Sequence, residues 1–363
     1  MGRREFNVVS YDANMASALI DDGQQDIVWH GVDEPGFRLG GLPFRTDGNF
    51  RRLPVLPEGA VPQAVDNLAW YTSGATLAFK TDSADICLRV KLFSGQLMDH
   101  MTAICRRGFD LYTGGPGTWT FCGVTRFPAQ ETEYAVILVR DLPREGMREF
   151  LLEFPLYCGV ESVEIGLDAA AKVAPPTPWN DGGCVVFYGT SITQGGCASR
   201  PGMCMANLLS RRWNMEVVNL GFSGSGKGEP EVMELVASVP DPAMFVLDYA
   251  VNAKLEGLKR TLPGAIDILR RRHPKVPIAL LTPMHLVREL FSEKQAKDFR
   301  EVREVMRAEA ARRNFAGDAN VHFVNGTVED PEWSDDMVDG THLTDLGFFR
   351  QYELVAPQLE KLL

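Results

Sequence analysis

Ser191 has the residue type and the surroundings of a nucleophile. It lies in the segment Gly189–Gly195, between an apolar run, Cys184–Tyr188, and a helix that we expect to begin at Pro201. A serine on a tight, glycine-flanked turn between a strand and a helix presents its hydroxyl group to a cleft, and nearby backbone N–H groups can hold an oxyanion. The same pattern also fits an ordinary Ser/Thr turn or a helix cap, so Ser191 alone does not establish catalysis.

A second segment, near the C-terminus, brings a carboxylate close to an imidazole. Asp339 and His342 are three residues apart in a predicted loop, ahead of a helix that we expect to begin near Thr344. At this spacing a carboxylate can reach its own histidine, fix the tautomer of the imidazole and stabilise its charged form. A loop acid beside a solvated histidine gives the same sequence, and Asp335 or Asp336 are alternative partners.

Two further segments contain polar or glycine-rich motifs: one offers hydrogen-bond donors, and the other has the spacing of a phosphate-binding loop. Asn252 ends the segment Asp248–Asn252 with a side-chain amide, which has two N–H donors. The segment Gly221–Lys227 has the spacing of a phosphate-binding loop, but Gly228 replaces the Ser or Thr that would bind Mg²⁺. We therefore do not expect nucleotide binding, and we interpret the serines in that segment as turn residues rather than nucleophiles.

These polar segments follow short apolar runs that have the character of buried strands. The runs are rich in Val, Ile and Leu and carry no charge inside, as expected for strands covered on both faces. Helices are predicted between them; Ser292, for example, begins a helix that reaches about Arg313. This alternation predicts a parallel sheet in an α/β/α domain, in which the residues following the strands meet at one edge. The predicted strands are Cys184–Tyr188, Glu216–Leu220, Met244–Tyr249, Val276–Leu281 and Val321–Val324.

The first half of the chain has a different pattern. Short segments of alternating apolar and polar residues are separated by turns such as Gly114–Gly117, which predicts an antiparallel β-sandwich. Ala174–Pro178 is interpreted as a stiff connector. We predict a sandwich domain over residues 1–175 and an α/β domain over residues 180–363, and leave strand pairing in the first 45 residues open. The predicted sandwich strands are Thr76–Phe79, Asp85–Leu92, Phe109–Tyr112, Trp119–Cys122, Tyr134–Val139, Glu149–Phe154 and Val160–Leu167.

Composition and charge argue against several classes of protein. The 363 residues are 45% hydrophobic and 23% charged, which is ordinary for a globular protein, and the formal net charge is −11. An acidic surface repels phosphate backbones and anionic lipids, so nucleic-acid and membrane partners are not expected. No apolar run approaches the roughly 18 residues that cross a bilayer. The start, Met1–Phe6, has no apolar stretch, so we expect a cytoplasmic location unless a secretion signal has been removed.

Cysteine and histidine spacing gives no support for a metal site. The seven cysteines include no Cys-x-x-Cys pair, and their odd number leaves at least one thiol free. The six histidines form no zinc-binding motif. We therefore expect no metal and no cofactor. Cys197 and Cys204 are close enough in sequence to pair across a loop, but free thiols are the favoured interpretation.

In order and spacing, the polar segments together resemble the four sequence blocks of the SGNH, or GDSL-like, hydrolases. The resemblance covers Cys184 to Leu363 and implies a flavodoxin-like α/β/α domain with a five-stranded parallel sheet. The half before it, from about Arg38, is similar to the jelly-roll-like sandwich domain that some members carry. The four matching blocks are Gly189–Ser191, Asn219–Gly224, Asp248–Asn252 and Asp339–His342.

The resemblance implies an SGNH-type serine esterase and a role for each matched residue. Ser191 would be the nucleophile, His342 the general base and Asp339 the acid that orients the base. The oxyanion would be held by the backbone N–H groups of Ser191 and Gly224 and by the amide of Asn252.

Two departures from the family pattern are visible. Thr190 stands where the family name has Asp, although its hydroxyl group can still donate a hydrogen bond, and family members with a leading sandwich domain show this variant. Val251 and Ala253 flank Asn252 in place of the usual Gly and Asp. Neither departure removes a catalytic group.

The sequence says less about the substrate than about the catalytic residues. The chain lacks the broad apolar lid or interfacial helix of a lipase, and the loop Gly196–Cys204 is expected to wall a compact polar cleft. Arg200 in that loop would offer donors to substrate oxygens, with a structural ion pair as the alternative, and His285 is a second candidate for the substrate pocket. We expect hydrolysis of a short acyl ester, with an acetyl group preferred, on a carbohydrate or other polyhydroxylated small molecule. An acyltransferase and a non-catalytic carbohydrate-binding protein are the alternatives, and the oligomeric state is left open.

Overall fold

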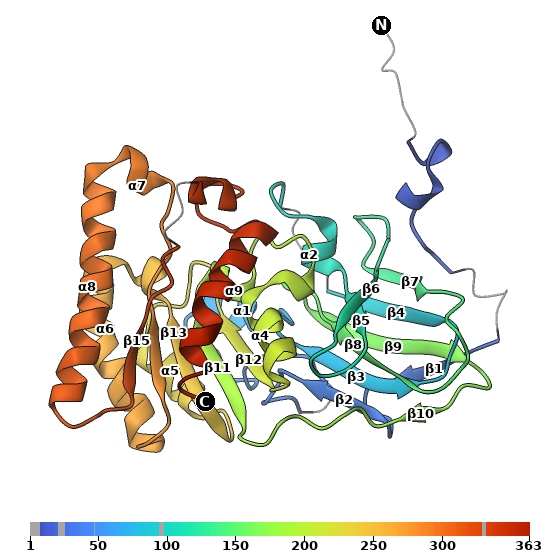
Figure 1. Cartoon of the computed structure of the whole chain (residues 1–363), viewed down its shortest axis with the longest axis horizontal. Helices are drawn as coiled ribbons and strands as arrows, with labels where there is room; N and C mark the ends of the chain where they lie inside the picture. Colours follow the sequence, from blue (N-terminus) through green and yellow to red (C-terminus); the bar gives the residue numbers. More distant parts are fainter. Residues whose placement is uncertain (1–7, 21–25, 47, 94–97, 329–331) are drawn as a thin grey trace, which may run out of the picture.

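The two halves of the chain lie side by side (Figure 1). The sheets of the first half lie next to the sheet and helices of the second half. The computed structural model describes residues 8–20, 26–46, 48–93, 98–328 and 332–363, so Met1–Phe6 lies outside the described residues. The described helices are η1 Val8–Ser10, η2 Ala13–Met15, α1 Gln63–Leu68, α2 Ala103–Arg107, α3 Ser191–Gln194, η3 Pro201–Met203, α4 Met205–Trp213, α5 Pro230–Ala237, α6 Ala250–Arg272, α7 Arg288–Phe291, α8 Glu293–Phe315, η4 Trp333–Asp336 and α9 Asp345–Leu359. The described strands are β1 Ile27–Gly31, β2 Phe37–Gly40, β3 Thr76–Thr81, β4 Ile86–Leu92, β5 Asp110–Thr113, β6 Thr120–Val124, β7 Glu133–Val139, β8 Arg148–Glu153, β9 Val160–Asp168, β10 Val173–Ala174, β11 Cys184–Gly189, β12 Val217–Gly221, β13 Pro242–Asp248, β14 Ile278–Leu281 and β15 Val321–Val324.

The first half is the predicted β-sandwich. One antiparallel sheet has the order β1-β9-β4-β7, and the other has the order β10-β3-β8-β5-β6 with β2 also paired to β3. Alternate side chains of the two sheets, among them Leu77, Phe79, Leu88 and Ile165, meet in one apolar core. All seven predicted sandwich strands are confirmed to within a few residues, and the region left open supplies β1 and β2.

The second half is the predicted α/β/α domain. Its five strands are all parallel, in the order β12-β11-β13-β14-β15. Successive residues of β11 face opposite sides: Val186 packs in a core with α5, α6 and α8, whereas Val185 and Phe187 pack in a core with α4 and α9. Because both faces are covered, the strands need the uninterrupted apolar composition that predicted them.

The hydrophobic core of the second half includes residues from the first half. Leu53, Val65 and Ala69 are fully buried in the same cluster as Val218 and Phe222. Val65 belongs to α1, which packs against the α/β domain rather than between the sandwich sheets. The division at residues 175–180 stays a prediction, but apolar packing continues across it.

The structure has one short helix that was not predicted. This helix, α3, is a single turn that starts at Ser191 itself, and the helix expected at Pro201 begins there only as the short η3, which leads into α4. The helix α8 has the predicted cap, since the Ser292 side chain accepts a hydrogen bond from the Gln295 N–H. In the part of the chain that the structure describes, no helix has both the length and the apolar character needed to cross a membrane.

Candidate active site

Ser191 is the first residue of α3, immediately after β11. The Thr190 hydroxyl caps this helix by accepting from the Ile192 N–H at 3.2 Å, and Thr193 accepts in return from the Thr190 N–H at 3.0 Å. Thr190 thus replaces the family's aspartate as a capping residue. Gly189 must be glycine here, because a Cβ atom would lie 1.9 Å from the Thr193 Oγ1 atom. The turn therefore holds the Ser191 side chain at the carboxyl end of β11.

Ser191, His342 and Asp339 form a continuous hydrogen-bonded relay. The Ser191 Oγ and His342 Nε2 atoms are 2.8 Å apart, and the His342 Nδ1 and Asp339 Oδ2 atoms are 2.7 Å apart. Ser191 is 8% exposed, so its hydroxyl group is reachable yet largely shielded from water. This is the geometry of a nucleophile, a base and an orienting acid.

The Asp339 carboxylate is held in its charged form. Its burial would raise the pKa, but hydrogen bonds from the His342 backbone N–H, the His342 imidazole and the Thr341 N–H outweigh this effect and lower the pKa of Asp339. A carboxylate that stays ionised can stabilise the imidazolium that forms when His342 takes a proton. The carboxylate of the rival acid Asp336 instead pairs with Arg350, and its backbone carbonyl accepts a hydrogen bond from the Thr344 hydroxyl group.

Three donor groups lie at the neighbouring strand ends. Gly224 follows β12 with φ at 67°, and its Cβ position is open space. One N–H of the Asn252 amide donates to the Phe222 carbonyl at 3.2 Å, which leaves the second free to donate elsewhere. Among the described residues, none accepts a hydrogen bond from the N–H of Ser191 or Gly224. All three predicted oxyanion donors thus follow neighbouring strands, and their shared role stays a prediction.

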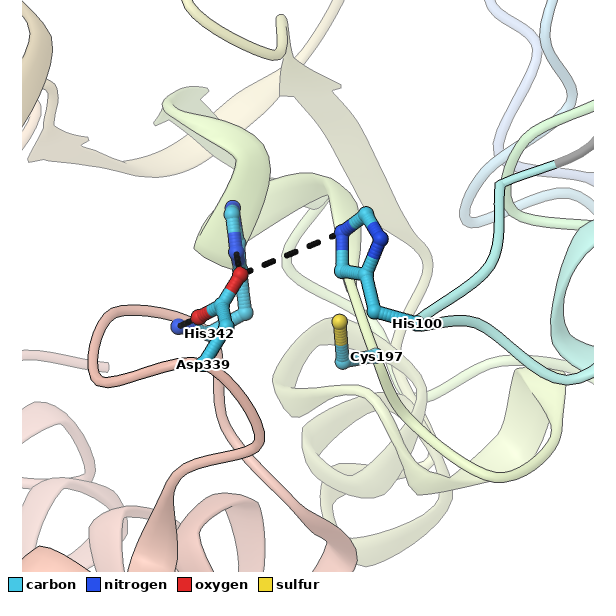
Figure 2. Close-up of side chains that lie close together, drawn as sticks. All are labelled: His100, Cys197, Asp339 and His342. Atoms are coloured by element: carbon cyan, nitrogen blue, oxygen red, sulfur yellow. Dashed lines mark hydrogen bonds and ion pairs between the residues drawn. The ribbon is translucent and has the colours of Figure 1, made fainter.

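His100 was not predicted as a site residue, and it comes from the sandwich half. Its Nε2 atom is 3.9 Å from the Asp339 Oδ2 atom, and its ring centroid is 5.9 Å from that of His342 (Figure 2). His100 precedes α2, and no motif around it indicates a site. Its position follows only from how the two halves pack.

Arg200 and His285, the two predicted substrate-binding residues, both have structural partners. Arg200 donates to the Asp110 carboxylate and the Tyr112 hydroxyl and lies over the Phe121 ring. This ion pair is the alternative that the sequence left open. It holds the Arg200 guanidinium group between the two halves. His285 stacks on Trp333 at 5.1 Å and lies 3.5 Å from the Glu289 carboxylate. A substrate contact for either residue stays a prediction.

Asp110 was missed as a key residue of the interface. It is fully buried at the start of β5, where it accepts from Arg200 and also from the Gly202 N–H at 2.9 Å. It belongs to the segment Gly108–Tyr112, which reads Gly-Phe-Asp-Leu-Tyr. An acid inside a predicted apolar strand was the available signal, since such a carboxylate needs a partner.

Comparison with known protein families assigns both halves. Residues 183–360 match the GDSL-like lipase/acylhydrolase family, and residues 27–173 match the N-terminal domain of SGNH-hydrolase-type esterases, whose family name contains the Gly-x-Asp-Leu-Tyr pattern. The chain belongs to the GDSL-like, or SGNH, hydrolase family. It is accordingly an enzyme, an SGNH-type esterase or acyltransferase. No curated protein sequence is significantly similar to it.

Solved structures share the two-part arrangement of this SGNH enzyme. A GDSL-like lipase from Bacteroides ovatus is 28% identical with a TM-score of 0.84, covering 93% of this chain and 98% of its own. A salicylyl-acyltransferase from a tetracycline biosynthetic pathway is 19% identical with a TM-score of 0.70, at the same coverage. A family two carbohydrate esterase from Cellvibrio japonicus is 13% identical with a TM-score of 0.59, again covering 93% and 98%. The last two similarities show the fold alone.

Proposed function

We propose that this SGNH enzyme hydrolyses a short acyl ester, an acetyl group by preference, on a carbohydrate or other polyhydroxylated small molecule. The observation that carries the hydrolytic part is the unbroken relay from Ser191 Oγ through His342 to Asp339, at 2.8 Å and 2.7 Å. The available N–H groups at the ends of β11, β12 and β13 supply the second requirement, an oxyanion site.

The reaction follows from these groups. His342 Nε2 takes the Ser191 proton as the Oγ atom attacks the ester carbonyl carbon, and Asp339 stabilises the resulting imidazolium. The carbonyl oxygen becomes an oxyanion that the N–H groups of Ser191, Gly224 and Asn252 bind. His342 then protonates the departing alcohol, which leaves an acyl group on Ser191. Water activated by His342 attacks the acyl-enzyme, and the acid departs.

A cavity of about 270 Å³ lies among α6, α7 and α8, where Lys254 and Leu255 closely follow Asn252 in sequence. Its lining mixes charged side chains, such as Arg288, with apolar ones, such as Phe299. The cavity therefore does not by itself select between a polar and an apolar substrate.

Exposed apolar side chains on α7 do not make it a lipid-binding helix. Leu290 and Phe291 are exposed on α7, which has only four residues and does not form the extended amphipathic helix that lies on a lipid surface. Structures of family two carbohydrate esterases with the same fold, one from Clostridium thermocellum in complex with cellohexaose, also support a sugar-based substrate.

The mechanism is tested at Ser191. Ser191→Ala removes the nucleophile, so turnover of a small chromogenic acetate ester should fall to background while the unfolding midpoint stays within a few degrees of wild type. Ser225→Ala, in the turn after β12, is the matched control and should retain activity. Covalent labelling by a fluorophosphonate should disappear only in Ser191→Ala, and full activity of that variant would rule the mechanism out.

The substrate class is tested by comparing esters. Initial rates on acetylated sugars and short acyl esters should exceed those on palmitoyl esters, since α7, with only four residues, is too short to serve as a lid over a long acyl chain. A palmitoyl ester turned over at least tenfold faster than an acetyl ester would contradict the proposed class without affecting the Ser191 mechanism.

An acyltransferase is the second candidate, favoured by the fold shared with the salicylyl-acyltransferase. The same acyl-enzyme would then be resolved by a hydroxyl group of an acceptor instead of water. Product analysis with added alcohols or sugars separates the two, because a transferase gives the new ester in excess of the free acid.

A further inference from the structure

Four potential metal ligands converge at the relay. His100, Cys197, Asp339 and His342 each offer one ligand atom, and these four atoms all lie within 4.8 Å of one another (Figure 2). They come from three separate loops, before α2, after α3 and before α9. This separation in sequence is why their spacing predicted no metal site.

The ligand types favour one class of ion. Two imidazoles, a thiol and a carboxylate form a borderline-soft set that suits Zn²⁺, whereas Mg²⁺ and Ca²⁺ prefer oxygen ligands alone. A tetrahedral zinc with bonds of roughly 2.0–2.3 Å places its ligands roughly 3.3–3.8 Å apart. The atoms that lie farthest apart must therefore approach one another by about 1–1.5 Å. The His100 side chain is 43% exposed, so it has room to rotate inward.

The backbone holds Cys197 in an unusual conformation beside the relay. Its φ is 71°, in the left-handed region that non-glycine residues rarely occupy, and its thiol is free. The preceding Gly196 is packed so closely that a Cβ atom there would lie 3.2 Å from the His342 ring. Such local strain is concentrated at functional sites. Here it accompanies a largely buried thiol at the relay.

We propose that His100, Cys197, Asp339 and His342 form a binding site for a thiophilic divalent cation, Zn²⁺, which reversibly inhibits the enzyme. The Cys197 thiol loses its proton to solvent as the thiolate binds, with no change in oxidation state. Whichever ring nitrogen of His342 binds the ion, the relay is broken: Nδ1 leaves Asp339, or Nε2 leaves Ser191. The inhibitory effect rests on the proposed function, whereas the binding site does not.

Binding is tested on the full chain with Co²⁺, which occupies zinc sites and absorbs visible light. Wild type should show a thiolate-to-cobalt charge-transfer band that Zn²⁺ abolishes by displacement. Cys197→Gly removes the thiol and relieves the left-handed strain, so it should fold normally and lose this band. His100→Ala should weaken cobalt binding at least tenfold. Cys122→Ser and His285→Ala are matched controls that leave the spectrum and affinity unchanged.

Inhibition is measured separately, relative to the metal-free rate of each variant. Zn²⁺ should suppress hydrolysis of an acetate ester in wild type, EDTA should restore it, and Cys197→Gly and His100→Ala should each need at least tenfold more Zn²⁺. Ser191→Ala should still bind Co²⁺ with the same band, so the site can be verified even if the enzyme proves not to be an esterase. The absence of the band in wild type, or equal affinities in wild type, Cys197→Gly and His100→Ala, would overturn the proposal.

Discussion

Asn252 shows how one side chain divides its donors between structure and chemistry. One N–H holds the Phe222 carbonyl, which fixes the amide, and the other is available to an oxyanion. Asn252→Ala should lower kcat for an acetate ester roughly 10²–10³-fold, because an oxyanion donor acts mainly in the transition state. KM should change much less. A kcat reduced less than threefold, in a variant that unfolds at the wild-type temperature, would show that Asn252 has no such role.

Asp248, behind the nucleophile turn, makes stability depend on pH. Burial raises its pKa from the usual 3.8 to about 7, against the opposing effect of the hydrogen bond that Thr193 donates at 2.7 Å. Between these values the folded state keeps a proton that the unfolded chain releases, so folding stability falls as pH rises from about 4 to 7. Asp248→Asn mimics the protonated acid and should stabilise the protein by about 1–3 kcal/mol at pH 8, with little effect at pH 4. Urea unfolding at both pH values measures this, and an equal effect at both would contradict it.

At the residue scale, local spacing picked out candidates without assigning their roles. Asp339 and His342 are three residues apart and Ser191 lies on a glycine-flanked turn, but only the order of all the blocks, which resembles the family pattern, distinguished them from an ordinary loop pair and an ordinary turn. The position of His100 and the partner of Arg200 could not be predicted from local pattern, because Asp339 and Asp110 are distant from them in sequence. Such contacts depend on the packing of one half against the other, which local spacing does not encode.

A buried arginine of the first half holds β12, the strand that precedes Gly224. Arg52 donates to the Asn219 and Gly221 carbonyls of β12 at 2.8 Å and 2.7 Å, and to the Leu68 and Tyr71 carbonyls. Arg52→Met would leave these acceptors without their donor, and should lower the free energy of unfolding by on the order of 3 kcal/mol.

The Arg52→Met variant should also lose activity, because the end of β12 supports the oxyanion turn. Arg260→Met, at an exposed position on α6, serves as the control and should change neither quantity. Denaturant unfolding and acetate-ester rates test both effects, and a wild-type unfolding midpoint for Arg52→Met would show that the contacts contribute little.

Apolar strands and long amphipathic helices were predictable from the sequence, whereas the single helical turn α3 was not. The five parallel strands and α8 contain enough apolar residues at the spacing of a buried strand or helix face to be predicted. The helix α3 is a single turn and has too few such residues. That turn depends on the Thr190 cap and on Gly195, whose φ of 99° ends the helix. A threonine and a glycine at this spacing also occur in ordinary turns, which is why the sequence predicted a helix only from Pro201.

At the scale of the whole molecule, the two halves share buried charge as well as apolar core. Arg211 of α4 pairs with Glu153 of β8 at 2.7 Å, and both side chains are largely buried. Burial raises the pKa of Glu153 to about 7 even though Arg211 opposes the shift. Separating the halves would break this pair but return both groups to water, so the shared apolar core, rather than the ion pair, holds the halves together.

Residues 180–363 expressed alone should therefore be neither soluble nor active. They would lack Leu53, Val65 and Ala69 from their core, and Arg52 from the end of β12, and the exposed apolar surface should drive association. Size-exclusion chromatography should show aggregates, and acetate-ester turnover should be at least tenfold below that of the full chain. A fragment beginning at residue 48 retains these four residues but lacks β1 and β2, so its β-sandwich should be less stable than that of the full chain. If residues 180–363 were monodisperse and fully active, the first half would be a separable accessory, and the shared core would contribute little to the catalytic half.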